Sequence, residues 1–543
     1  MKKTALLLFL ALGSFLFLEA KSLGSLLPQH HITVTRLPVL GSSMTEYGPF
    51  VMFFRCINHT AAPLPLEITV INHNREKIVL RISKHIQLPG LSTSEVSIAV
   101  PFTKPTWGPV SFEAFSNAGV KLKLNKGNIS YERTSQLTSP SFAPDFFEYL
   151  FEKSSRSAIP VSEWPADYRA YGGRNLIVLD STDILSPKLR QALLLAAAQG
   201  THILTLVRGN APWPLEAGAV PLTARKVVQP IGFGSWTYFR TQAVSSNPRW
   251  KAFTQKKQAL LKKHGAWHNT YRRLKWEEEA FYKCLNARNQ TRNLHNALSI
   301  PPPPVPLTVL CVIMVCFVLL IGPVNFFVLK RYHKELWSLV TIPVLSLIFS
   351  GTVILSVLFS EGFYSKGKAS VETFIDQRTG LTASRGSFAI YAPIASSSFQ
   401  FDADDLLYFH DPGTIRGEVK DKYIYSSGLL RSRMSFSYAV SRAGFRSEKI
   451  AVSEKNGSIE IVNGLGVPLT ECLLKNSEGK LFRLQVPLAP GARASLKPST
   501  PLKEESVPQK NCYTAQVSKP FFITCGATPD KYEYKETING IWR

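Results

Sequence analysis

The sequence is poor in the residues and spacings that build metal sites. Its seven cysteines are scattered, no CxxC pair occurs, and no histidine stands at zinc-finger spacing from any of them. His264 and His268 are four residues apart, but no third ligand follows. We therefore expect no metal and no cofactor. Cys512 and Cys525 could form a disulfide within one C-terminal β unit if the compartment is oxidising.

Common catalytic motifs are missing as well. The chain has no GxSxG motif and no GxxxxGK followed by Ser or Thr, and the GFGSW stretch at 232–236 lacks the third glycine of a dinucleotide-binding loop. After residue 365 no cluster of His, Asp, Glu or Ser stands at catalytic spacing, and the acidic stretch DADD at 402–405 is typical of a solvated loop. The sequence therefore predicts a protein that is not an enzyme.

Acidic residues are scarce relative to basic ones. There are 38 Asp and Glu against 63 Lys and Arg, for a formal net charge of +25. Such an excess is typical of nucleic-acid-binding proteins when the compartment contains nucleic acid. Much of the charge lies in residues 247–297, where Lys and Arg alternate with tryptophans. The alternatives for this segment are contact with anionic lipid headgroups or acidic envelope polymer, and a solvated helix face.

The N-terminus is typical of a secretory signal. Residues 1–20 begin with two lysines after Met1, continue with an apolar core of about fourteen residues and end in a small residue, Ala20. Cleaved or not, such a signal exports the residues that follow it. We therefore expect no nucleic-acid partner.

Two runs without charge, at 305–329 and 336–360, predict a membrane hairpin. Each has about twenty-five residues, against the roughly twenty that cross the hydrocarbon core of a bilayer. The segment that links them, 330–335, carries the basic or titratable residues Lys330, Arg331, His333 and Lys334. With export of the N-terminus, two crossings place this tip in the cytoplasm, as the positive-inside rule favours. We expect a two-pass protein of the bacterial inner membrane with both terminal domains outside the cytoplasm.

Three residues interrupt these apolar runs. Pro323 and Pro343, one in each span, are expected to kink the helices. Asn325 is the only side-chain amide in the two runs. It indicates either a hydrogen bond between the helices or a polar coupling site.

The remaining chain is rich in β patterns with one α/β segment. Short β-branched and aromatic runs between about residues 30 and 135 predict an immunoglobulin-like sandwich. Residues 175–209 read strand, helix, strand, with Ser186 as the helix N-cap, Pro187 in its first turn and Gly200 past its end. This pattern predicts a small α/β domain with a parallel sheet.

In such a sheet a ligand would lie at the carboxyl ends of the strands. Asp180 and Asp183 follow the first strand and Arg208 follows the second, so these three form the candidate ligand site. The alternative is that the carboxylates cap the following helix. After residue 365 the pattern is β again, and residues 457–496 repeat in outline the stretch at 50–102.

The order of these parts, together with the stretches IGPVNFFVLKR at 321–331 and LWSLVTIPVL at 336–345, resembles a family of uncharacterised bacterial two-span membrane proteins with a glutamine amidotransferase-like ectodomain. The genes of that family often lie near those of MoxR-type ATPases, so the resemblance implies a cytoplasmic ATPase as a partner. No cysteine stands where the amidotransferase nucleophile would follow a strand, so that chemistry is not expected in this chain.

We therefore expect a multidomain α+β membrane protein, an envelope scaffold or interaction protein that is not an enzyme and whose partner is either in the envelope or a cytoplasmic ATPase. The alternatives are a periplasmic hydrolase or ligand sensor that uses the α/β domain, and an accessory subunit of an export system. The predicted parts are a signal peptide (1–20), a β-sandwich (21–135), the α/β domain (136–245), a basic helical segment with a Pro-rich linker (246–304), the first span (305–329), the cytoplasmic loop (330–335), the second span (336–360) and an outer β-rich domain (361–543).

Overall fold

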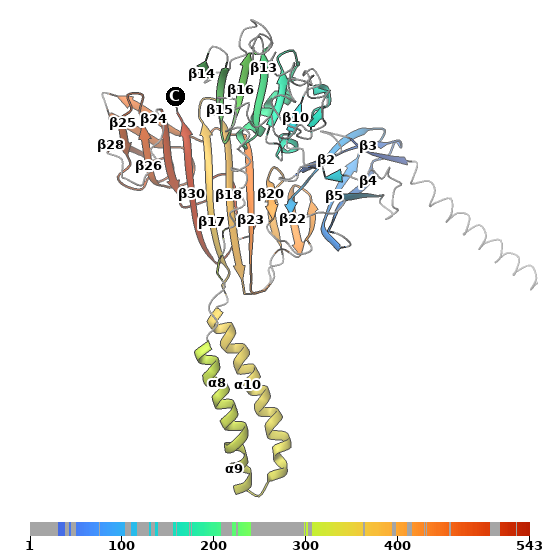
Figure 1. Ribbon diagram of the computed structural model, residues 1–543, viewed down its shortest axis with the longest axis vertical. Coiled ribbons are helices and arrows are strands. Elements are labelled where there is room, and N and C mark those ends of the chain that lie inside the picture. The colour runs from blue at the N-terminus through green and yellow to red at the C-terminus, as the bar shows by residue number, and fades with distance from the viewer. Residues whose placement is uncertain are drawn as a thin grey trace, which may run out of the picture.

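The fold is described from a computed structural model of the chain (Figure 1). The residues that it describes are 31–37, 43–44, 50–74, 77–103, 110–116, 130–131, 136–138, 156–158, 160–172, 174, 176–207, 220–223, 226–240, 298, 300–301, 307–361, 364–393, 398–409, 415–427, 429, 432–455, 458–499, 511–527 and 529–542. The predicted signal peptide, the basic helical segment and Arg208 lie outside these residues.

A twelve-stranded sheet forms the centre of the molecule (Figure 1). Its order is β24 (Ile450–Lys455), β25 (Ser458–Asn463), β28 (Arg493–Pro498), β27 (Leu481–Arg483), β26 (Leu469–Lys475), β29 (Cys512–Val517), β30 (Lys531–Ile541), β17 (Lys366–Asp376), β18 (Leu381–Ala392), β23 (Met434–Phe445), β20 (Leu406–Phe409) and β7 (Phe102–Thr103). β17 lies well inside this sheet, because it pairs with β30 in parallel and with β18 in antiparallel, over eleven residues on each side.

Strands from the two ends of the chain form one further sheet. Its order is β19 (Phe399–Asp402), β22 (Lys422–Ser427), β21 (Ile415–Val419), β5 (Lys77–Leu88), β4 (Leu64–Asn74) and β8 (Val110–Ser116). The joining pair is β5 with β21, which run parallel from Leu80 opposite Ile415 to Lys84 opposite Val419. The sequence predicts separate domains at 21–135 and 361–543. In the structure, strands from these two parts pair with each other and pack around one core.

The C-terminal strands supply the aromatic part of this shared core. Phe401 contacts the rings of Phe409, Tyr425 and Tyr438, with centroids 5.5 to 6.4 Å apart. These separations suit offset and edge-to-face aromatic pairs, which add to the free energy of apolar burial. The N-terminal strands supply the aliphatic part of the same core. A three-stranded sheet of β1 (Ile32–Arg36), β3 (Phe50–Asn58) and β6 (Thr93–Val100) lies beside it, and β2 (Ser43–Met44) pairs with β9 (Ser130–Tyr131).

The α/β segment forms a seven-stranded sheet. Its order is β11 (Arg156–Ala158), β10 (Gln136–Thr138), β12 (Leu176–Asp180), β13 (His202–Val207), β16 (Gly234–Arg240), β15 (Lys226–Ile231) and β14 (Val220–Thr223). The predicted strand, helix, strand unit is confirmed, because β12 and β13 pair in parallel around α3 (Pro187–Ala198). Ser186 accepts a hydrogen bond from the Leu189 amide as N-cap.

Helix α3 is covered on both sides. It packs against β16 of its own sheet and against β18 and β23 of the twelve-stranded sheet. One core therefore contains Leu193 from the helix together with Ala383 and Ala439 from the large sheet. The GFGSW stretch is not a strand-to-helix loop. It is the tight turn of the β15–β16 hairpin, in which Gly232 has a φ of +56° and a Cβ there would lie 2.6 Å from the Ala198 carbonyl oxygen.

The predicted internal repeat has a shared structural detail. Asn58 and Asn463 each end a strand, and each is buried. The Asn58 amide nitrogen donates to the carbonyl oxygens of Ala62, Leu88 and Pro89 at 2.8 to 3.3 Å. The Asn463 amide nitrogen makes the same three bonds, at 2.8 to 3.2 Å, to Val467, Leu488 and Ala489.

The strands around the two asparagines also correspond. β1 pairs with β3 so that Ile32 faces Asn58, and β24 pairs with β25 so that Ile450 faces Asn463. The carbonyl that precedes each edge strand, of His31 or Lys449, accepts a bond from the residue after the asparagine. Residues 31–100 and 449–498 therefore contain two copies of one β motif, which we call the N-terminal and the C-terminal motif.

Two apolar helices leave the body as an antiparallel hairpin (Figure 1). One arm is continuous through α8 (Leu307–Leu319), the π-helical turn η4 (Leu320–Val324) and α9 (Asn325–Arg331); the other begins with η5 (Glu335–Trp337) and continues as α10 (Ser338–Glu361). Both arms are long and apolar enough to cross a membrane, with mean hydropathies of 2.9 and 2.1, and neither is buried by the rest of the chain. Pro323 lies inside η4, where the wider turn accommodates its missing amide proton.

Candidate functional site

The two predicted carboxylates at the end of β12 bind their own loop. Asp183 accepts a hydrogen bond from the Asp180 amide at 2.8 Å. Asp180, which is 4% exposed, accepts two bonds from Thr182, from its amide at 3.0 Å and its hydroxyl at 2.9 Å. Side-chain bonds of this kind to nearby backbone amides stabilise turns. In these bonds the carboxylates stabilise their own turn, whereas the N-cap of the following helix α3 is Ser186.

The third member of the predicted site, Arg208, lies outside the described residues, so the site is not assembled from the described part of the chain. Within that part, no three His, Cys, Asp or Glu side chains come together as metal ligands. The predicted disulfide between Cys512 and Cys525 is not formed. Cys512 begins β29 opposite Ile541, whereas Cys525 packs against the shared core with its sulfur 3.1 Å from the Tyr438 hydroxyl.

A three-way junction, which sequence reasoning missed, is formed by the short helix η2 (Tyr168–Tyr171). The Arg169 guanidinium binds Asp167 through two nitrogens and also donates to the Ala403 carbonyl at 2.5 Å and the Ser97 hydroxyl at 3.3 Å. One side chain therefore joins the α/β segment, the N-terminal motif and the C-terminal half. Asp167 and Arg169 are two residues apart, but nothing in that spacing reveals their distant partners.

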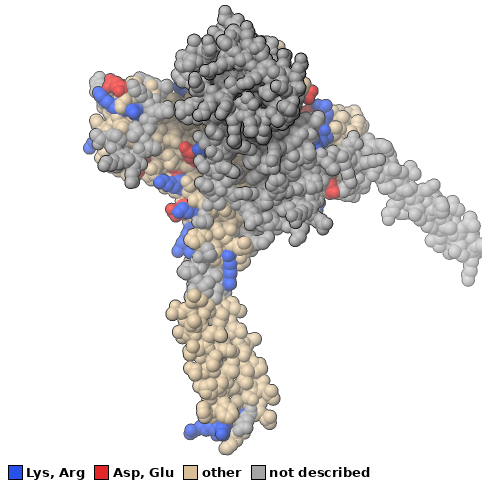
Figure 2. Space-filling view, in the orientation of Figure 1, with Lys and Arg blue, Asp and Glu red and all other residues tan. Residues whose placement is uncertain are grey.

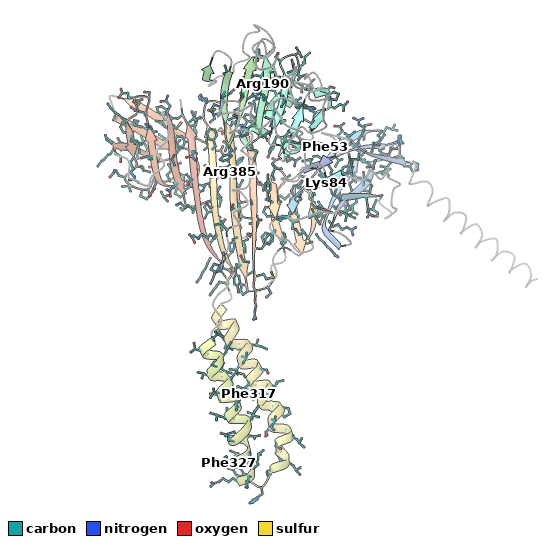
Figure 3. All side chains as sticks on the ribbon, viewed as in Figure 1. Phe53, Lys84, Arg190, Phe317, Phe327 and Arg385 are labelled. Atoms are coloured by element: carbon teal, nitrogen blue, oxygen red, sulfur yellow. The ribbon has the colours of Figure 1, made fainter. Side chains whose placement is uncertain are left out.

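Neighbouring residues strengthen this junction. The Tyr168 hydroxyl donates to the Asp404 carbonyl at 2.7 Å, and Lys84 donates to the Ser97 carbonyl at 3.0 Å. Burial and the nearby Arg169 charge lower the pKa of Lys84. Figure 3 shows Lys84 on the side of the N-terminal strands that faces the rest of the body. The junction is polar and its central side chains are largely buried, so its hydrogen bonds fix how the three segments are placed.

The DADD stretch is not the solvated loop that was predicted. The Asp405 side chain is buried and accepts a hydrogen bond from Arg442 Nε at 2.8 Å, and Asp402 forms an ion pair with the same guanidinium. Burial raises the pKa of Asp405 to about 6, although the Arg442 charge opposes the shift. The loop is therefore a structural turn at the edge of the junction.

A cation and an aromatic ring link the seven-stranded sheet to the large sheet. The Arg385 guanidinium, on β18, lies 4.0 Å from the centre of the Phe233 ring and 2.8 Å from a carboxylate oxygen of Glu372. Figure 3 shows Arg385 in the middle of the large sheet. Phe233 belongs to the turn between β15 and β16, so this contact holds that hairpin against the sheet.

The tip of the hairpin is a compact basic turn. Its four residues, Lys330, Arg331, His333 and Lys334, are exposed. His333 has a φ of +52°, its amide donates to the Lys330 carbonyl, and the Lys334 amide donates to the Leu329 carbonyl. This is the Schellman pattern that ends helices, with histidine at the position where glycine is usual. The turn is well defined, and Figure 2 shows its charges gathered at the far end of the hairpin.

The interhelical reading of Asn325 is confirmed. The Thr341 hydroxyl, on α10, donates to the Asn325 side-chain oxygen at 3.1 Å. The rings of Phe317 and Phe349 also meet across the hairpin, with centroids 5.2 Å apart. Figure 3 shows Phe317 midway along the hairpin. These contacts join the two arms of the hairpin directly.

Comparison with known proteins gives no assignment. No protein-family model matches the chain, and no curated protein matches it. The chain is similar to the yeast delta-COP-I mu-homology domain (10% identity, 33% of this chain and 95% of that chain, TM-score 0.20), to an M1 zinc metallopeptidase from Deinococcus radiodurans (10%, 24% and 41%, 0.13) and to a Paenibacillus cycloisomaltooligosaccharide glucanotransferase (11%, 42% and 36%, 0.17). The chain spans less than half of the two enzymes. TM-scores this low carry no argument about its fold or activity.

Proposed function

We propose that this chain is a membrane-anchored scaffold of the bacterial envelope, without enzymatic activity, whose β-rich body binds a partner outside the cytoplasm. The observation that carries the proposal is the direct join between anchor and body. Helix α10 ends at Glu361 and β17 begins at Lys366. Because β17 pairs along both sides, the anchor continues into the interior of the largest sheet.

The join is fastened by side chains at its start. Asp530 accepts hydrogen bonds from the Ser365 amide at 2.7 Å and from its hydroxyl at 2.9 Å, and the Lys531 amide donates to the Ser365 carbonyl. These bonds fix the start of β17 to the residues that begin β30, so the chain from the hairpin enters the body at one defined point. A defined entry point suits a scaffold.

The roles of the predicted ligand residues also support a scaffold. The carboxylates of Asp180 and Asp183 are engaged by backbone amides of their own loop. The junction at Arg169 joins three segments by fixed hydrogen bonds. Polar side chains in the described body thus serve mainly to fix its shape, which is what a binding scaffold requires.

The proposal also includes more specific assignments of fold and of location in the membrane. We take the two β motifs to be immunoglobulin-like and the β12–α3–β13 unit to be amidotransferase-like, in an inner-membrane protein with both large parts outside the cytoplasm. The resemblance in the hairpin sequence adds a cytoplasmic partner, a MoxR-type ATPase, which would meet the basic tip. Supporting this, the tip holds its four basic or titratable side chains on one defined turn.

Cross-linking in intact cells, followed by affinity purification, tests the proposal. Wild type is compared with a tip variant, Lys330→Gln, Arg331→Gln and Lys334→Gln. The matched control removes the same number of positive charges from the exposed side chains of the body, as Lys480→Gln, Arg493→Gln and Lys497→Gln. Labelling of the tip from each side of the membrane checks the topology, since these residues also help to orient the hairpin.

We expect wild type and the control to capture an ATPase that the tip variant loses, and all three to capture the same envelope partner. Capture of the ATPase by all three would refute the tip as its binding site. Capture of no envelope protein by any of them would refute the scaffold role of the body.

A further inference from the structure

The end of the large sheet that faces the hairpin is rich in basic and exposed apolar side chains. The pairing registers place Lys366 opposite Lys531 in β30, and Met434 opposite Ala392, at this same end. Arg433 precedes Met434 and is exposed. We call Tyr364, Lys366, Arg433, Met434 and Lys531 the hairpin-proximal edge.

The exposed side chains of this edge combine two chemistries. Tyr364 is 59% exposed and Met434 is 51% exposed. Lys531 Nζ lies 5.4 Å from the centre of the Tyr364 ring. An aromatic ring with a cation over it, with an exposed thioether at the same end of the sheet, is the composition of a membrane interface, where rings lie at headgroup level and cations meet phosphate.

The acidic residues of this end are already engaged. Asp530 accepts two bonds from Ser365, and Glu533 pairs with Lys368 at 3.5 Å. The described residues 364–368, 432–434 and 529–533 contain four basic side chains against these two acidic ones, so the net charge of this end is positive. Figure 2 shows Lys and Arg side chains along the body where the hairpin joins it.

The tether brings this edge to the bilayer. Five residue steps separate Glu361 from Lys366, which even fully extended span at most about 18 Å. The headgroup layer of a bilayer is roughly 5 to 8 Å thick on each side. The edge therefore lies within reach of the headgroups whenever the hairpin is inserted.

We propose that the hairpin-proximal edge is a second membrane contact, which binds the headgroups of anionic phospholipids and holds the body against the bilayer. The proposal rests on membrane insertion of the hairpin, and it adds a lipid preference that insertion alone does not require. Arg433 and Lys531 supply charge to the phosphates, while Tyr364 and Met434 enter the interfacial layer. A neutral bilayer would offer the same anchor but a weaker hold on the body.

Hydrogen exchange of the full-length chain in lipid nanodiscs tests this. Discs of phosphatidylcholine alone are compared with discs that also contain phosphatidylglycerol, and peptides covering residues 364–368 and 429–434 are followed by mass spectrometry. The internal reference is the peptide around Phe445, which lies at the opposite end of the same strand and is 45% exposed. The charge variant is Arg433→Gln with Lys531→Gln, and its control is Lys480→Gln with Lys497→Gln.

In discs that contain phosphatidylglycerol, we expect the edge peptides to exchange more slowly than in discs of phosphatidylcholine alone. The peptide around Phe445 should exchange at the same rate in both. High salt should remove the difference while the protein stays in the disc, because screening shortens electrostatic range. Each charge removed should weaken the docked state about fivefold, and the control pair should have no effect.

Equal exchange at the edge in both kinds of disc would refute the lipid contact and leave the anchor intact. Protection that persists in the charge variant would refute headgroup charge as its cause. Failure of the chain to enter discs of either composition would refute the anchor itself, and this inference with it.

Discussion

Asn58 and Asn463, which are 405 positions apart in the chain, make the same set of hydrogen bonds in two copies of one β motif. In each copy the amide nitrogen donates to three carbonyl oxygens and the side-chain oxygen accepts from an amide two residues later. A buried amide satisfied in this way joins the end of a strand to two loops.

Replacing either asparagine should destabilise its motif. Asn58→Ala or Asn463→Ala leaves three carbonyls with one partner fewer, at a cost of about 2 to 3 kcal/mol. Thermal unfolding of the detergent-solubilised protein measures the loss. The control is Ser495→Ala, an exposed residue of β28 that should change stability by less than about 0.5 kcal/mol. Equal effects of the two asparagine variants would support the repeat, and a stable variant would contradict the role of the bonds.

The hairpin should depend on the bond between Thr341 and Asn325. Thr341→Val keeps the shape of the side chain but removes the donor, and should weaken helix association by about 0.6 to 1.7 kcal/mol. Thr352→Val is a matched control, because the Thr352 hydroxyl bonds to Ile348 in its own helix at 2.9 Å. Unfolding in mixed micelles separates the two. If both variants behave alike, the interhelical bond does not stabilise the hairpin.

Arg169 should matter far more than an exposed arginine. Arg169→Ala leaves the Asp167 carboxylate, whose side chain is 20% exposed, without its cation and frees two acceptors in the other segments. We expect a loss of about 3 kcal/mol. Arg55→Ala is the control, since its pair with Glu95 is half exposed and worth at most about 1 kcal/mol. Limited proteolysis should show the segments separating in the Arg169 variant alone.

Glu536 should make stability fall as pH rises. Its carboxylate is buried and accepts bonds from Thr373, Tyr534 and the Phe521 amide. Burial raises its pKa above the ordinary 4.5 despite these donors. A raised pKa in the folded state means that this contribution is fully present below about pH 4.5 and is lost as pH rises through the folded value.

Glu536→Gln removes that titration. Compared with wild type, the variant should lose less stability between pH 5 and pH 8 in a series of thermal melts. The variant shares every other acid with wild type, so the difference between the two curves isolates this group. Parallel curves would show that Glu536 does not titrate in this range.

The elements predicted well from the sequence carry local signals. The hairpin follows from two runs of uncharged residues, and the β12–α3–β13 unit follows from Ser186, Pro187 and Gly200 at its boundaries. Such patterns depend on residues that are close together in the sequence, so they can be recognised without knowing which distant residues lie nearby. The sequence leaves two interpretations of Asn325. The interhelical hydrogen bond is one of them, because a lone amide in an apolar run needs a partner on a neighbouring helix.

The features that were missed depend on distant parts of the chain. β5 pairs with β21 more than three hundred residues later, and Arg169 binds Ala403, which is 234 positions away. The sequence predicts that Asp405 is exposed, since nothing near it in the sequence indicates that it is buried in an ion pair with Arg442. Strand patterns specify which face is buried but not which strand lies alongside.

The way α10 enters β17 also determines how the molecule would respond to tension. A pull on the hairpin enters the sheet at Lys366, at one end of a strand held by eleven residue pairs on each side. The load then acts along the strand, so the ladder bonds on both flanks are sheared together rather than opened one after another. Under the proposed membrane anchoring, the chain would transmit force between the bilayer and the body before it yields.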